Sequence, residues 1–362
     1  MLAKRIISIS LVSIMLCLVA VFANPQKTPT TGIPQKFNKV FVGKIGDKYA
    51  IHMDLNRSDQ NFNGSYYYDN VGSGIDVEGT IDARGKFKLT ETDQSGNESA
   101  SFVGTLTVSG TGELQVIKLE GTWQRKGAAS PLSFVATELK FDLGMGAKIE
   151  SKKINREVKK PKYTIDIEYP QVTGLVDPGQ DAFNKYVDTL INKEITDFKK
   201  SIDETMEVPP DSTGSSLDIN YSVEYATNKL ICISILEGTY EAGAAHPNEG
   251  YITVNYDTEK HKDIKLSTLF KPNTKYLTAI SRYCITQLRK TLGNDGSDWI
   301  NTGAAPQADN YRAWCITDSG LLILFSPYQV ASYAEGAQQV LVPYSKIADL
   351  IDPLGPVGGL VK

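Results

Sequence analysis

Residues 325–344 read Phe-Ser-Pro-Tyr-Gln-Val-Ala-Ser-Tyr-Ala-Glu-Gly-Ala-Gln-Gln-Val-Leu-Val-Pro-Tyr. The pattern predicts the end of one strand, an aromatic-rich crossing loop and a second strand. Tyr328 and Tyr333 in this loop are candidates for partner contact, because aromatic side chains on a rim loop supply a large contact area at low entropic cost. The alternative is that they pin the crossing between the two strands.

The surrounding residues, 163–352, alternate between strand and helix patterns, which predicts an α+β unit with an antiparallel sheet and packed helices. Tyr163–Tyr169 alternates with period two, and Pro170 is expected to end that strand. Amphipathic helices are predicted at about 180–206 and 273–292, with a short helix at 344–351. Further strands are predicted at 217–226, 230–240, 250–256, 311–316, 321–325 and 339–342.

Two more side chains of this unit are candidates for partner binding. His246 lies in the turn Gly243-Ala-Ala-His-Pro247, where its ring can meet a ligand or hold the turn through a backbone carbonyl. Trp299 lies in a long predicted loop, 293–310, and is either a binding anchor or a ring tucked onto the sheet. The acidic residues of that loop do not have the spacing of a calcium-binding loop.

The chemistry of the chain gives no metal or cofactor prediction. Its three histidines are far apart in sequence, and the chain has no Gly-x-Ser-x-Gly, His-Glu-x-x-His or Cys-x-x-Cys motif. Cys284 shares a helical stripe with Ile280 and Leu288 and is predicted to be a buried small hydrophobe. Any disulfide is expected to join Cys232 and Cys315, which lie in strand segments of one sheet.

Residues 37–141 predict an all-β meander that closes or curves like a small barrel. An apolar-x-Gly-Ser/Thr-apolar phrase recurs at Phe62, Val77, Phe102 and Leu119, which predicts bends or close backbone approaches. Tyr66 and Tyr68 share one strand face and are a secondary candidate for stacking on glycan, with filling of the barrel core as the alternative. His52 is out of phase with its apolar neighbours and is expected to face solvent.

Residues 142–162 are rich in lysine and are predicted to be a solvated basic linker between two separately folding units. Contact with anionic wall polymers or lipid headgroups is the functional alternative. The remaining segments flank these units. Residues 1–23 predict a cleaved secretion signal, with a retained membrane anchor as the alternative, and 24–36 a Pro/Thr-rich tether; 353–362 is a C-terminal tail.

The signal predicts an extracytoplasmic location, whether periplasmic, in the cell envelope or secreted. No later apolar run has the length of a membrane span. The chain has 38 basic and 42 acidic residues, a net charge of −4, so there is no electrostatic case for a nucleic-acid partner.

Residues 163–352 resemble the RsiV family, extracytoplasmic domains of lysozyme-sensing anti-sigma factors that also occur as N-terminal modules of peptidoglycan deacetylases. The resemblance is carried by Tyr163–Pro170 and the helix after it, by Gly243–Pro247 before a strand containing Asn255-Tyr-Asp257, and by the loop 325–344. Family members often divide into a helix-bearing part and a strand-rich part. They often have proline where this loop has Ser332.

The resemblance implies a non-catalytic envelope module that binds peptidoglycan or a wall-targeting protein such as lysozyme. The missing hydrolase motifs argue against catalysis. Two alternatives remain open: a peptidoglycan-modifying hydrolase or deacetylase-associated protein, and a structural protein of the envelope.

Overall fold

The computed structural model describes residues 32–69, 74–92, 97–110, 115–144, 146–175, 178–202, 214–293 and 297–361. The predicted signal peptide, most of the predicted tether and the carboxylate of Asp295 lie outside the described residues. In the described part, no helix is long and apolar enough to cross a membrane.

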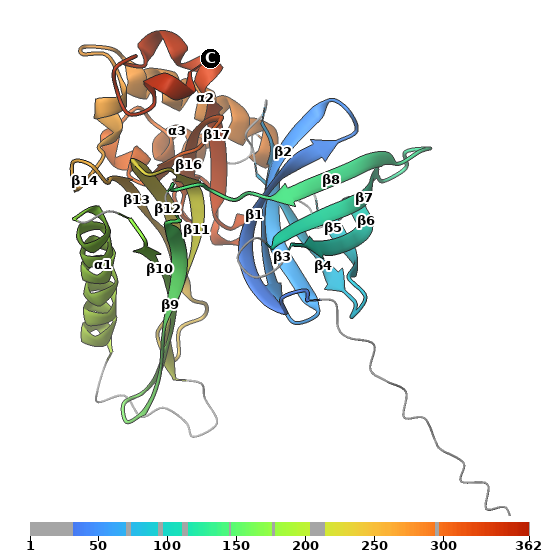
Figure 1. Ribbon diagram of the computed structural model, residues 1–362, viewed down its shortest axis with the longest axis horizontal. Helices are drawn as coiled ribbons and strands as arrows, with labels where there is room; N and C mark the ends of the chain where they lie inside the picture. The colour runs from blue at the N-terminus through green and yellow to red at the C-terminus, as the bar shows by residue number, and fades with distance from the viewer. Residues whose placement is uncertain are drawn as a thin grey trace, which may run out of the picture.

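The first half is a closed antiparallel barrel, which confirms the all-β prediction (Figure 1). Each strand pairs with the next, and β1 also pairs with β8 to close the cylinder. The strands are β1 Lys36–Ile45, β2 Tyr49–Ser58, β3 Asn61–Tyr68, β4 Ile75–Ile81, β5 Lys86–Thr92, β6 Glu98–Ser109, β7 Val116–Arg125 and β8 Leu132–Glu138.

The recurring glycines lie where neighbouring strands come into close contact. A Cβ built on Gly104 would stand 2.3 Å from the carbonyl oxygen of Glu120, and one on Gly121 would stand 2.1 Å from that of Val103. Gly64 and Gly79 are equally crowded by the adjacent strand. The predicted close backbone approach is therefore confirmed, and it lets the sheet coil tightly enough to close.

The second half begins with a six-stranded sheet in the order β14-β13-β12-β11-β10-β9. Its strands are β9 Lys148–Lys159, β10 Lys162–Thr173, β11 Ser215–Ala226, β12 Leu230–Tyr240, β13 Asn248–Asp257 and β14 Lys262–Asp263. The sheet is mixed and not purely antiparallel, because helix α1, Gly179–Ser201, lies in the connection between β10 and β11 and lets β11 run parallel to β10. Strand β10 continues through Pro170 to Thr173, so that proline does not end it.

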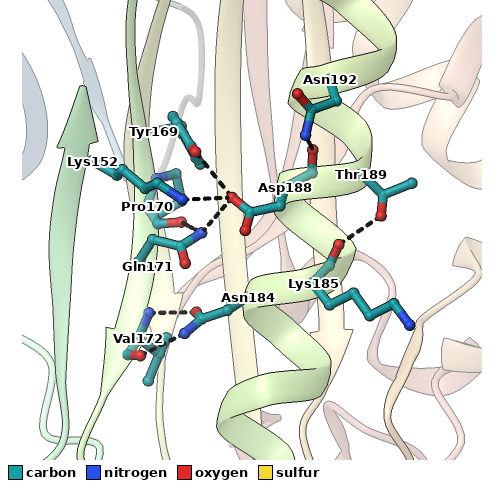
Figure 2. A network of polar contacts seen from close by, with 10 residues as sticks. All are labelled: Lys152, Tyr169, Pro170, Gln171, Val172, Asn184, Lys185, Asp188, Thr189 and Asn192. Atoms are coloured by element: carbon teal, nitrogen blue, oxygen red, sulfur yellow. Dashed lines mark hydrogen bonds and ion pairs between the residues drawn. The ribbon is translucent and has the colours of Figure 1, made fainter. Parts of the chain in front are cut away.

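Helix α1 covers one face of this sheet, and Phe183, Val187 and Ile191 enter the shared core. Polar contacts add to this packing (Figure 2). Asp188 Oδ1 accepts hydrogen bonds from the Tyr169 hydroxyl at 2.9 Å and from Lys152 Nζ at 3.2 Å. Asn184 pairs with both backbone groups of Val172.

The segment predicted as a basic linker is the edge strand β9. It pairs with β10 from Lys148 to Lys159, without interruption. Its alternation is masked in the sequence because most of its side chains on both faces are exposed and charged. A lysine-rich edge strand is a common protection against edge-to-edge association.

The last part of the chain is a three-stranded sheet with helices packed on it. The elements are α2 Tyr276–Leu292, α3 Ser297–Gly303, β15 Trp314–Ile316, β16 Gly320–Phe325 and β17 Gln338–Pro343. Helix α2 confirms its prediction, whereas the long predicted loop contains α3, and residues 344–351 form two 3₁₀ turns in place of a helix. Cys284 is fully buried in this core, as predicted. All three described cysteines are free thiols, so the expected Cys232–Cys315 disulfide is not formed.

The barrel packs against the second half along a continuous seam. Tyr67, on the outer face of β3, is buried with Cys315, Leu322, Leu324 and Leu341 of the three-stranded sheet. Strand β1 lies beside β11 (Figure 1). The positions of the domain boundaries remain a prediction, but the two halves are in contact across this buried seam.

Candidate functional site

The crossing loop between β16 and β17 is held at its ends by buried strands. Val330 is buried beneath the loop. The Gln329 side chain donates to the carbonyl oxygens of Gly303 at 3.1 Å and Asn310 at 3.0 Å, which ties the loop to the end of α3. These contacts fix a backbone that would otherwise be free at the surface, and rigid support favours a binding role for its side chains.

Four side chains from three separate segments meet on this loop, and we call them the aromatic patch: His246, Trp299, Tyr328 and Tyr333. The His246 ring stacks on Tyr333 with a centroid separation of 3.8 Å and an interplanar angle of 21°. Tyr328 lies 5.6 Å from Tyr333 and 6.2 Å from Trp299, again between ring centroids. The structure thus assembles the four residues predicted for partner contact into one cluster.

The patch is accessible. Trp299 is 43% exposed and Tyr328 is 50% exposed, which is unusual for such large side chains. Contiguous exposed aromatic surface of this kind marks binding sites for proteins or sugars.

His246 both holds its turn and contributes to the patch. Its Nδ1 lies 2.8 Å from the carbonyl oxygen of Pro247, so this nitrogen carries the donated proton. In the neutral ring, Nε2 is then an acceptor, and the Tyr328 hydroxyl lies 3.2 Å from it. The contact with Pro247 supports the predicted role of His246 in holding its turn, and its role toward a ligand stays a prediction.

Tyr328 has a φ of 68°, in the left-handed region that non-glycine residues rarely adopt. Strain of this kind persists where surrounding contacts impose it, and it concentrates at binding sites. The conformation brings the Tyr328 ring to His246 and Trp299.

The tyrosines of the barrel do not form a second exposed patch. Tyr66 is fully buried in the barrel core, where its hydroxyl donates to Glu91 Oε2 at 2.7 Å. Tyr68 is partly buried and meets the Tyr66 ring edge-on at 5.5 Å. The inward face of β3 therefore fills the barrel, and stacking of a sugar on Tyr66 is excluded by its burial.

His52 is buried, which corrects the expectation that it faces solvent. It does point away from the barrel core, as its phase predicted, but the second half of the chain covers it. Its Nδ1 lies 2.8 Å from Asp69 Oδ1, and its Nε2 lies 3.3 Å from Asp318 Oδ1 without hydrogen-bond geometry. Burial alone lowers the pKa of His52, but Asp318 and Asp69 outweigh it and raise the pKa to about 9.

Two acidic residues that sequence analysis did not identify as candidates lie between the barrel and the second half of the chain. Asp54 of the barrel and Glu224 of β11 are partly buried there, with Ser222 and Ser234 as hydroxyl partners. In the sequence, each is simply a polar residue at an outward position of a strand with alternating apolar residues, and this pattern does not distinguish it from a solvent-exposed residue. Among the described residues, no group of three or more histidine, cysteine or acidic side chains is arranged to hold a metal ion.

Comparison with known proteins identifies which proteins this chain is similar to. Residues 156–249 match the family model "Deacetylase PdaC", and residues 267–345 match "Protein of unknown function (DUF3298)". The first range holds α1 with the long strands β10, β11 and β12, and the second holds α2 and α3 with the short strands β15, β16 and β17, so the second range is not the strand-rich one.

Three curated proteins are similar at low identity. Peptidoglycan-N-acetylmuramic acid deacetylase PdaC of Bacillus subtilis is 26% identical over 162 residues, which cover 44% of this chain and 34% of the deacetylase. The chain thus spans about a third of that relative. Immunogenic protein MPT64 of Mycobacterium tuberculosis is 24% identical over 54% of this chain and 81% of its own length. Esterase Rv3036c of the same organism is 26% identical over 57% of this chain and 87% of the esterase.

A solved structure of a DUF3298 family member from Bacteroides fragilis aligns with a TM-score of 0.47 at 17% identity, over 60% of this chain and 98% of that chain. The family-model matches and the similarity to PdaC show segments similar to the deacetylase-associated and DUF3298 domains, consistent with a peptidoglycan-associated envelope protein. The resemblance to the lysozyme-sensing anti-sigma factors stays a prediction.

Proposed function

We propose that this chain is an extracytoplasmic, non-catalytic protein that binds peptidoglycan through the aromatic patch. The observation that carries the proposal is the convergence of His246, Trp299, Tyr328 and Tyr333 on one rigid loop. Exposed rings stack on the apolar faces of sugars, and the Tyr328 hydroxyl adds a polar contact beside them. The predicted signal and the similarity to a peptidoglycan deacetylase support the compartment and the ligand.

The test is co-sedimentation of the chain, expressed without residues 1–23, with purified sacculi. Truncating a central aromatic of a binding site costs about 2 kcal/mol, or roughly 30-fold in affinity. Trp299→Ala and Tyr333→Ala should therefore weaken binding while leaving the circular-dichroism spectrum unchanged. Tyr49→Ala is the matched control, because Tyr49 is also exposed but lies on the barrel.

Each outcome is decisive for the patch. If Tyr333→Ala abolishes the folded spectrum, Tyr333 is a packing residue. If both patch variants bind sacculi like the wild type, the binding site lies elsewhere. A parallel pull-down with lysozyme distinguishes the glycan from a wall-targeting protein as the ligand.

An esterase or deacetylase activity is the second candidate. It is favoured by the match to an esterase over 87% of that relative and by the contact between the Tyr328 hydroxyl and His246 Nε2. Against it, Nδ1 of His246 faces a carbonyl group, whereas a catalytic histidine is usually oriented by a carboxylate. Hydrolysis of p-nitrophenyl acetate that is lost in His246→Gln would favour this activity over simple binding.

A further inference from the structure

The seam between the two halves holds a cavity of about 390 Å³, which we call the seam cavity. Strands β1 to β4 of the barrel form one side, and β11 to β13 form the other together with β16, β17 and the end of the crossing loop. Five carboxylates line it: Asp54, Asp76, Glu78, Glu224 and Glu249. Half of the other lining residues are asparagine, glutamine or serine, and no lysine, arginine or histidine is among the described residues that line the cavity.

Asp54 and Glu224 approach the cavity from opposite halves, and each has a single hydroxyl donor. Ser222 Oγ donates to Asp54 at 2.8 Å, and Ser234 Oγ donates to Glu224 at 2.6 Å. Glu224 lies at a bulge in β11, where the register with β12 shifts. Bulges commonly re-aim a side chain next to a functional site.

Among the described residues, no basic side chain forms an ion pair with these five carboxylates. Burial raises the pKa of Asp54 to about 6, against the hydrogen bond from Ser222. Burial and the charge of Asp54 raise the pKa of Glu224 to about 7, against Ser234 and the more distant His52. His52 is held between Asp69 and Asp318, so its positive charge already has two partners.

The negative charge of these carboxylates also affects the Tyr251 hydroxyl. Its pKa is raised by burial and then by Asp54, Glu224, Asp76 and Glu249. Like charges brought together in a cavity destabilise the folded state unless a cation joins them. A ligand that carries a positive charge would therefore be favoured in this cavity.

We propose that the seam cavity binds a polyhydroxylated ligand with a primary ammonium group, that is, an amino sugar whose amine is not acylated. The ammonium group offers three donors to Asp54, Glu224 and their neighbours. The amide and hydroxyl side chains of the wall, such as Asn38, Asn63 and Gln339, suit sugar hydroxyls. A cavity of this volume is within the usual range for small-molecule sites.

The experiment is calorimetric titration of the full chain at pH 7 with a tetramer of β-1,4-linked glucosamine and with its fully N-acetylated counterpart. We expect the free-amine tetramer to bind at least about tenfold more tightly, as a charge-assisted contact requires. The double variant Asp54→Asn/Glu224→Gln should lose this preference. The matched control Glu120→Gln, which changes an exposed barrel carboxylate, should keep it.

Folding of the double variant is checked independently. Its amides can still accept from Ser222 and Ser234, and the repulsion between the two halves is removed, so its melting temperature at pH 8 should equal or exceed that of the wild type. Equal binding of the two tetramers by the wild type would overturn the proposal. Equally tight binding of lysine amide, an amine without the sugar hydroxyls, would overturn the assignment to a sugar.

The two sites can be separated because none of the four patch residues lines the seam cavity. Trp299→Ala should weaken binding to sacculi yet keep the preference for the free amine. Failure of the patch variants therefore bears on the proposed function alone, and failure of the double variant bears on the cavity alone.

Discussion

His52 is the single residue whose surroundings differ most from those its sequence position indicated. It lies on the outer face of a barrel strand, stacks on Tyr67 at 5.3 Å and contacts a carboxylate from each half. A protonated histidine between two carboxylates links the barrel to the turn before β16. Its protonation should therefore influence the stability of the whole chain.

We predict that stability falls above neutral pH because His52 loses its proton. Its pKa of about 9 in the folded chain exceeds the ordinary 6.5, so its contribution is complete below pH 6.5 and disappears as the pH rises through 9. The loss amounts to up to about 3 kcal/mol. Urea unfolding at pH 6 and pH 9.5 should show a larger difference for the wild type than for His52→Gln.

The control for this prediction is His261→Asn. His261 is exposed and has a φ of 53°, a conformation that asparagine tolerates. The control should follow the wild type at both pH values. A His52→Gln variant that shows the full wild-type pH dependence would assign the effect to other groups.

At the scale of elements, neighbouring barrel strands need glycine at the positions where their backbones come closest together. Gly104 faces Gly121 across β6 and β7, and each would clash with the neighbouring strand if it carried a Cβ. Ordinary strand preferences would favour larger residues at these positions. The close approach explains why glycine is required.

We predict that Gly104→Ala destabilises the barrel by about 1–3 kcal/mol, the usual cost of overpacking. Gly238→Ala is the control, because a Cβ at this position in β12 would meet its nearest neighbour, Asp218, only at 3.9 Å. Denaturant unfolding measures both. Equal stability of the two variants would show that the barrel relaxes around the added methyl group.

A second prediction at this scale concerns the resistance of strand β9 to proteolysis. Paired along its full length with β10, it should resist trypsin despite five basic residues between Lys148 and Lys159. Lys126, in the exposed turn after β7, should be cut earlier. Mass spectrometry of the first fragments identifies the earliest cleavage site. Initial cleavage at Lys152 or Arg156 would instead support the interpretation of this segment as a linker.

At the scale of the whole molecule, the barrel and the second half of the chain meet along one seam. The barrel core and the cores of the second half are separate clusters, and Tyr67 belongs to the small cluster between them. The phenol is buried, with His52 on one side and aliphatic residues of the three-stranded sheet on the other. It is therefore the main apolar contact from the barrel.

We predict that Tyr67→Ala uncouples the halves without unfolding either. Removing a buried aromatic side chain costs about 3–5 kcal/mol, and here the loss falls on the seam. Scanning calorimetry should show two separated transitions in the variant and more closely coupled transitions in the wild type. A single transition lowered as a unit would mean that the halves fold together.

The sequence by itself determined the α+β class, the barrel-like first half, helix α2 and the burial of Cys284, because periodicity and glycine placement are local signals. It also identified the four residues of the aromatic patch as candidates. Tertiary structure decided that these four, up to 87 positions apart, form one cluster. It also decided that a charged segment is strand β9 and that His52, on the outward face of β2, is buried. Those outcomes depend on which surfaces meet, and a polar outward residue has the same local pattern whether it faces water or another half of the chain.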